Sequence, residues 1–482
     1  MVARATRQIC DSHPCLPFMT PQDNADGSGG NGQIGQILQC RLGASEKDHP
    51  VDIKFEAGCI ADIALHSTGT SQEHPTSKHA QTRTFDAGNR LLAPSLCHPH
   101  VHLDKAFILG HPKYSHLQVK DGTFDEAMKL TNEAKKMFEL DDLLVRGRRS
   151  ITESILAGVS HMRAFVEVDE IVGLKCLEAG TTLKQEFEDR CHVQLCAFAQ
   201  LPLKPNDPAG DKIRHLMVQA LLPEHHVDAV GSTPYVEKDE KAQQANIEWL
   251  VDLALEYEKH LDFHLDYSVD PESPAMVHLL LQFLKHRDWT SKSNKCITLG
   301  HCTRLIFYSD KDLHQLRTEI GDLPVSFVGL PTSDLYMMKT DPSLRLHQSE
   351  LRTTLNVPKL IKDFGFNAAI GMNNIGNAFT PYGTCDPLFL ATIAAGIYQT
   401  GTQQDARLLY DCVSSRAKAA IGFEDKVESG SERTSLRKGD EATFVLFPAG
   451  PEGFVSEQSI EGQIYYYNQG GRQVFYRGRL IT

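Results

Sequence analysis

The sequence lacks the features by which several common protein classes are recognised. No run of apolar residues approaches the roughly 18–20 that a membrane-spanning helix needs, so we expect no membrane association. The first thirty residues contain no apolar segment typical of a secretory signal. No phosphate loop or GxGxxG motif stands between a strand and a helix, so we expect no nucleotide cofactor.

Acidic residues outnumber basic ones, and no cysteines are spaced as CxxC pairs. The formal net charge of −13 argues against nucleic acid or an anionic membrane as the main partner. The 12 cysteines are scattered without a CxxC pair, and several lie inside apolar runs. In a long chain without a secretory signal, this pattern favours reduced thiols and a cytoplasmic location. A secreted, disulfide-bonded enzyme is the alternative.

The composition that remains is that of a folded protein. With 482 residues and 41% apolar residues, the chain is large enough for one large domain and a smaller one. Residues 1–32 are rich in Pro, Gly, Asn, Asp and Ser, and we expect them to form a mobile leader. Alternating segments follow, with a β-hairpin predicted at Glu56–Gly58.

The middle of the chain alternates between strand and helix patterns. Helices are predicted over residues 122–138, 141–158 and 243–260, and apolar β runs separate the helical stretches. About eight strand candidates predict a parallel sheet closed into a (β/α)8 TIM barrel over residues 94–438. Short strands resume near the end, so residues 33–93 and 439–482 are predicted to form one small composite β-sandwich.

Two histidines, His100 and His102, stand in "PSLCHPHVHLDKAF" at the end of an apolar run. Side chains two apart in a strand point to the same face, so both imidazoles aim at one place. Such a pair is either a packing accident or half of a metal site.

Other polar residues end the later strand candidates, where the active site of such a barrel lies. They are Glu167, Gln200, His264, Asp266, His301 and Asn373. Four histidines at three separate strand ends favour a metal site over chance placement.

These segments, with "ILAGVSHMRAFVEVD", "DFHLDY", "TLGHCT" and "IGMNNIGNAFTPYG", resemble the cytosine deaminase branch of the amidohydrolase superfamily in the right order from about residue 35 onward. The resemblance implies a barrel with a β-sandwich and one divalent metal ion, zinc or iron, bound by His100, His102 and His264. It further implies that His301 touches the metal-bound water and that Gln200 holds the edge of a ring-shaped substrate. A small-molecule substrate and a homo-oligomer are also implied.

Two positions depart from that family pattern. Asn373 stands where the family carries a metal-binding, proton-accepting aspartate, and Tyr267 stands in place of the proton-donating glutamate. An amide has no useful basicity, and tyrosine is a poor base near neutral pH. Both usual proton-handling carboxylates are therefore missing from their expected positions.

Three interpretations follow. In the first interpretation, the enzyme is active and its acid–base groups lie at other positions, for which Asp266 and Glu167 are candidates. Asp266 shares a predicted strand face with His264; the alternative is that it orients a metal-binding histidine. Glu167 faces inward and is also a candidate substrate-binding residue; an ion pair with Arg163 or Lys105 is the alternative. In the second interpretation the metal site is intact but the enzyme catalyses a different reaction. In the third, the barrel is catalytically silent and binds a ring-shaped ligand. We favour a metal-dependent hydrolase of a non-peptide C–N bond in a cyclic amidine or amide.

Overall fold

The computed structural model describes residues 33–43, 49–67, 83–338, 352–423, 436–449, 459–466 and 470–482. The predicted leader, residues 1–32, lies outside these ranges. Within them, no helix combines the length and the apolar character needed to cross a membrane. None of the ten cysteines in these ranges is in a disulfide, and nine of the ten are buried.

Eight parallel strands form the larger part of the molecule, as the sequence predicts. Their order in the sheet follows their order in the chain. The strands are β6 (Leu96–His102), β7 (Val159–Glu167), β8 (His192–Ala199), β9 (Ala229–Ser232), β10 (His260–Leu265), β11 (Ile297–His301), β12 (Val325–Gly329) and β13 (Ala368–Ile370). The barrel closes just beyond β13, where the Asn373 amide donates to His100 O (2.9 Å) and the His102 amide donates to Asn373 O (2.8 Å). The predicted TIM barrel is confirmed.

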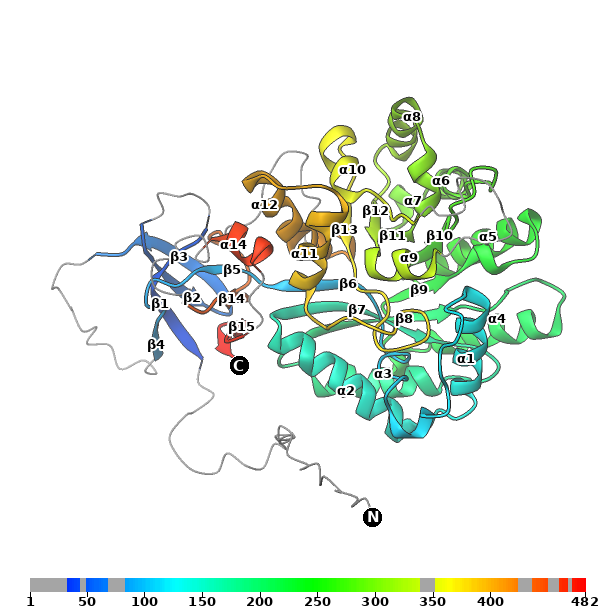
Figure 1. Cartoon of the computed structure of the whole chain (residues 1–482), viewed down its shortest axis with the longest axis horizontal. Helices are drawn as coiled ribbons and strands as arrows, with labels where there is room; N and C mark the ends of the chain where they lie inside the picture. The colour runs from blue at the N-terminus through cyan, green and yellow to red at the C-terminus, as the bar shows by residue number, and fades with distance from the viewer. Residues whose placement is uncertain are drawn as a thin grey trace, which may run out of the picture.

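Helices cover the outside of the cylinder (Figure 1). The main ones are α1 (Phe124–Lys135), α2 (Leu140–Leu156), α3 (Lys175–Glu186), α4 (Pro208–Ala220), α5 (Glu240–Glu256), α6 (Val277–His286), α8 (Asp310–Ile320), α10 (Val357–Phe364) and α11 (Pro387–Ile397). The short α9 (Pro331–Met337) follows β12, and α12 (Gln403–Cys412) and α13 (Ser415–Ala420) follow α11.

The predicted start of α1 and end of α2 are present in the structure. Thr123 caps α1 by accepting the amide N–H of Glu126, and two acids lie in the first turn. Gly158 follows α2 with a φ of +104°, a conformation that disfavours residues with a Cβ. These local signals set the start of α1 and the end of α2, and Gly158 leads directly into β7.

Two small sheets lie beside the barrel (Figure 1). One contains β1 (Ile34–Cys40), β2 (Val51–Glu56), β3 (Cys59–Leu65) and β4 (Arg83–Asp86), and the other contains β5 (Leu92–Pro94), β14 (Phe444–Leu446), β15 (Gln473–Tyr476) and β16 (Arg479–Leu480). The predicted hairpin joins β2 to β3. Buried residues from both ends of the chain, such as Ile53 and Phe444, share one apolar cluster. The composite β-sandwich is confirmed, and its exact boundaries remain a prediction.

Candidate metal centre

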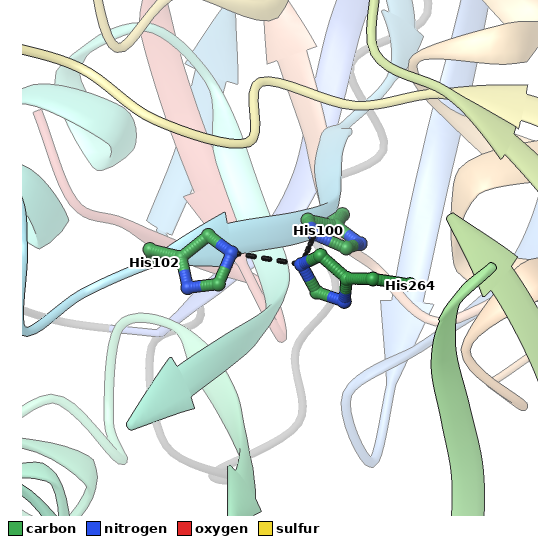
Figure 2. Close-up of side chains that lie close together, drawn as sticks. All are labelled: His100, His102 and His264. Carbon is green, nitrogen blue, oxygen red and sulfur yellow. Dashed lines mark hydrogen bonds between the residues drawn. The ribbon is translucent and has the colours of Figure 1, made fainter. Parts of the chain in front are cut away.

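Three histidine rings converge at one end of the barrel. His100 and His102 extend from β6 toward His264 on β10, and all three are buried (Figure 2). The Nε2 atoms of His100 and His102 each lie 3.0 Å from Nε2 of His264. Strand alternation brings the first two rings together, and only the barrel brings the third from 162 residues away.

This geometry fits a divalent metal ion. Two nitrogens bound to one metal at about 2.1 Å lie roughly 3.0–3.4 Å apart, depending on the bond angle. The Nε2 separations fall in that range, and the three rings form the one cluster of potential metal ligands found among the described residues. Imidazole nitrogens suit zinc, iron and related ions.

The protonation state of the rings also suits metal binding. Burial lowers the pKa of all three histidines well below the usual value, and neighbouring positive groups lower it further. For His102, the largest of these neighbours is Lys105. Contact with the Asn373 side chain acts in the opposite direction on His100 and His102. The rings are therefore neutral at pH 7, as ligands must be.

His301, the fourth predicted histidine, lies at the end of β11 beside the cluster. Its ring centroid is 5.2 Å from that of His264 and 4.3 Å from that of Tyr267. Its Nδ1 lies 2.7 Å from the carboxylate of Asp334, which is fully buried on α9. Thr354 donates to the other oxygen of Asp334, also at 2.7 Å.

Asp334 is not among the candidate residues that the sequence pattern indicates. The available signal was an acid in the first turn of a helix that directly follows a barrel strand, in "GLPTSDLYMM". The Asp334 carboxylate reaches His301 because β11 and β12 are neighbours in the sheet.

Asn373 and Tyr267 both line the cavity beside the histidines. Asn373 adopts a φ of +62°, and its buried Oδ1 accepts no hydrogen bond from the described residues. Tyr267 lines the cavity in front of the histidines. Burial raises its pKa well above the usual value, and Asp334 and Tyr235 raise it further, so the phenol stays protonated at neutral pH.

The structure places Asp266 differently from the prediction. The strand ends at Leu265, and Asp266 has a φ of +49°, so the alternation that would put it on the face of His264 is broken. Its two carboxylate oxygens accept the amides of Met276 (2.7 Å) and Val277 (3.1 Å) at the start of α6. Burial raises the pKa of Asp266 to about 6. The expectation of a shared strand face is wrong, and this carboxylate anchors a helix.

Glu167 forms the buried ion pair that was its predicted alternative. Its carboxylate lies 3.1 Å from Lys105 Nζ and 2.6 Å from Lys135 Nζ. Burial alone would raise the pKa of Glu167, but the two lysines lower it to about 2. Arg163, the other partner considered, pairs instead with Asp262 at 2.9 Å. Glu167 is not among the residues that line the cavity.

A small cavity lies in front of the metal centre. Gln200 lines it, together with Lys105 and Asn374. Aromatic side chains form much of the remaining wall, namely Phe124, Tyr235, Tyr267 and Phe379. The volume that the centre of a water molecule can occupy is about 20 Å³, which is room for little more than one water. Little free space therefore lies in front of the three histidines.

Two curated proteins are similar to the chain in sequence. No protein-family model matches the chain. The uncharacterized protein YahJ of Escherichia coli (strain K12) is 23% identical over 76% of this chain and 71% of its own length. N-isopropylammelide isopropyl amidohydrolase of Pseudomonas sp. (strain ADP) is also 23% identical, over 79% and 84%.

Solved structures share the fold along nearly the whole chain. A 5-methylcytosine deaminase from Klebsiella pneumoniae matches with a TM-score of 0.74 and 21% identity, over 93% of this chain and 97% of that one. An N-isopropylammelide isopropylaminohydrolase from Burkholderia multivorans gives 0.70 and 19%, over 92% and 97%. A zinc-bound adenosine deaminase from Xanthomonas campestris gives 0.60 and 15%, over 93% and 91%. The predicted resemblance to cytosine deaminase-like proteins is confirmed, at low sequence identity.

Proposed function

We propose that this protein is a metal-dependent hydrolase that cleaves a non-peptide C–N bond in a small cyclic amidine or amide. The convergence of three neutral imidazoles on one point carries this proposal. His100, His102 and His264 would hold the ion. When bound, a divalent ion in such a site supplies a water acidic enough to attack at neutral pH. The similarity to deaminases and ammelide hydrolases supports the same chemistry.

His301 is the residue that we propose for proton transfer. When its Nδ1 carries the proton, it donates to Asp334, and Nε2 is left as an acceptor. In this tautomer Nε2 takes a proton from the attacking water and passes it to the leaving nitrogen. Asp334 is a positioning residue, because it selects the tautomer and stabilises the protonated ring. The histidine–aspartate pair thereby replaces the two carboxylates that Asn373 and Tyr267 have displaced.

Neighbouring groups restrict what else contributes. Tyr267 keeps its proton at neutral pH, so it donates a hydrogen bond and does not act as a base. Asp266 is held at the start of α6, and Glu167 lies between two lysines. We therefore propose that neither carboxylate takes part in proton transfer.

The test combines metal analysis with turnover. The purified protein should contain about one zinc or iron per chain, and His264→Ala should lose it. Release of ammonia or an amine is then measured for pyrimidines, triazines and cyclic amides. Turnover that depends on bound metal supports the proposal, and absence of metal from the native protein refutes it.

The replacement of both family carboxylates favours one alternative, a catalytically silent barrel that binds a ring-shaped ligand. Full metal occupancy without turnover on any member of the panel would establish it. Asn373→Asp then tests whether restoring the carboxylate restores activity.

We also propose that the partner is a small molecule rather than nucleic acid or a membrane, because the net charge is −13. The zinc in similar structures supports zinc over iron. A cytoplasmic location and a homo-oligomer are the remaining parts of the proposal. Cell fractionation and light scattering test these two.

A further inference from the structure

One wall of the cavity is made of polar groups whose orientations are determined by their neighbours. Lys105 reaches it from the segment after β6 and is almost fully buried, with 1% of its surface exposed. Its ammonium forms an ion pair with Glu167 and donates to Gln200 Oε1. An ammonium carries three N–H donors and no acceptor, so one donor remains for the cavity.

The contact with Lys105 determines how Gln200 is oriented. Because an ammonium only donates, the oxygen of Gln200 must face it, and the amide NH₂ points the other way. That NH₂ group has only a weak acceptor, the Met128 sulfur at 3.3 Å. Gln200 therefore presents a donor to the cavity.

Asn374 is oriented by a similar argument, through Asn377. The Oδ1 of Asn377 accepts the amides of Phe379 and Thr380, so its NH₂ group is the end that donates. It donates to Lys105 O at 3.1 Å and to Asn374 Oδ1 at 2.8 Å. With its oxygen thus bound, Asn374 offers its own NH₂ group to the cavity.

The cavity also has an unusual charge balance for a metal-centre pocket. None of the described residues that line it is a carboxylate. Two acids behind the wall, Glu167 and Asp334, contact Lys105 and His301. Lys105 thus presents a positive group to the cavity, with its counter-charge on Glu167 behind it, and a bound divalent cation would add positive charge. Such a pocket favours negative charge in its ligand.

The apolar part of the wall suits a flat ring. Phe124 from the start of α1 lies 5.8 Å from Phe379 and 6.3 Å from both Tyr235 and Tyr267, measured between ring centroids. Aromatic faces at such spacing stack on planar groups.

We propose that the substrate is an anionic, oxo-substituted nitrogen heterocycle, whose oxygen-bearing edge binds Lys105, Gln200 and Asn374. This rests on the proposed function in taking the ring as substrate. Three donors and a positive charge match adjacent carbonyl oxygens that share a negative charge. They do not match a ring that presents an amino group to the same edge, because two donors would then face each other.

Binding of three pyrimidines of similar size tests the proposal. Barbiturate is an anion at neutral pH, uracil is neutral with two oxo groups, and cytosine is neutral with one oxo and one amino group. Calorimetry with metal-loaded protein should show barbiturate bound at least about tenfold more tightly than uracil or cytosine. Equal or weaker binding of barbiturate, or no detectable binding, overturns the proposal.

The variant Asn374→Asp tests whether the preference for barbiturate over uracil arises from this polar wall. Aspartate keeps an oxygen for Asn377 to donate to, but replaces the donor facing the cavity with negative charge. The barbiturate-to-uracil preference should fall at least about tenfold, whereas Gln244→Glu, an equal charge change at an exposed position on α5, should leave it unchanged. Lys105→Met should lose the preference as well. Thermal unfolding and metal content establish that each variant is folded and loaded, and an unaltered preference in Asn374→Asp contradicts the proposal.

The outcomes separate this inference from the proposed function. Tight barbiturate binding without turnover of any C–N substrate would contradict the proposed hydrolase function but support the inference about ligand binding. Efficient deamination of cytosine, with cytosine bound more tightly than barbiturate, removes the inference and leaves the function.

Discussion

The Nδ1 atom of His301 lies 2.7 Å from the buried carboxylate of Asp334. This contact joins a strand end to the first turn of the helix after the next strand. It leaves Nε2 of the imidazole as the free nitrogen when the ring is neutral. We propose that this pair provides the proton transfer group that the sequence pattern lacks at positions 267 and 373.

We predict that Asp334→Asn lowers kcat by about 10²-fold or more while metal content stays unchanged. An asparagine that turns its NH₂ group toward Nδ1 would favour the opposite tautomer, with the proton on Nε2. Steady-state kinetics over a range of pH measures the effect. Thr354→Val, which removes only the hydrogen bond to Asp334, should cause a smaller loss. A normal rate and pH profile in Asp334→Asn would contradict this role.

Asn373→Asp should bind the metal ion more tightly. A carboxylate is a charged ligand, whereas the amide oxygen of Asn373 is neutral and weak. We expect the dissociation constant to fall by about tenfold or more. Competition with a chelator measures it. Unchanged affinity would show that the side chain at position 373 does not reach the ion.

Lys135→Met should destabilise the fold strongly. Lys135, on α1, pairs with Glu167 and Asp169, and all three side chains are almost fully buried. Removing one partner of a buried ion pair costs about 3–5 kcal/mol of unfolding free energy. Urea unfolding measures the loss. Lys359→Met, which breaks the exposed pair with Asp310, is the control and should cost less than about 1 kcal/mol.

Phe124→Ala should open the metal centre. Phe124 closes the aromatic wall, and the space behind it holds little more than one water. Its removal widens the entrance, so a chelator should strip the metal several-fold faster. Stopped-flow absorbance with a coloured chelator follows the rate. A matched change at exposed Leu140, at the start of α2, should have no effect, and an unchanged rate in Phe124→Ala would place the entrance elsewhere.

Acid should weaken the fold through His260. Burial, together with nearby Arg163, lowers its pKa to about 3, and its Nδ1 accepts the amide of Cys296 at 3.0 Å. Below the usual histidine pKa of about 6.5, His260 of the unfolded chain binds a proton. In the folded chain, His260 stays neutral down to about pH 3. Stability should therefore fall as pH drops, by up to about 2 kcal/mol between pH 6.5 and 5 from this residue.

The measurement is the unfolding free energy of native protein and His260→Asn over this pH range. Asp266, whose pKa is raised to about 6, contributes with the opposite sign, so the difference between the two proteins is the quantity to compare. Identical pH slopes would contradict the prediction.

The sequence by itself determined the barrel and the three histidines of the candidate metal centre. Alternation of apolar strands and amphipathic helices is local and survives in any context that buries the apolar faces. The spacing of His100 and His102 places both rings on one face of a strand, and parallel strands bring their ends to one side of the barrel.

Only the tertiary structure decided which polar groups face the cavity. The positive φ of Asp266 turns its carboxylate toward α6, which breaks the strand alternation expected from the sequence. Asp334 reached His301, and Asn377 set the orientation of Asn374, through contacts between segments folded together by the barrel. Side-chain direction at a strand end depends on the backbone leaving the strand and on the nearest buried hydrogen-bonding partner, and a residue pattern encodes neither.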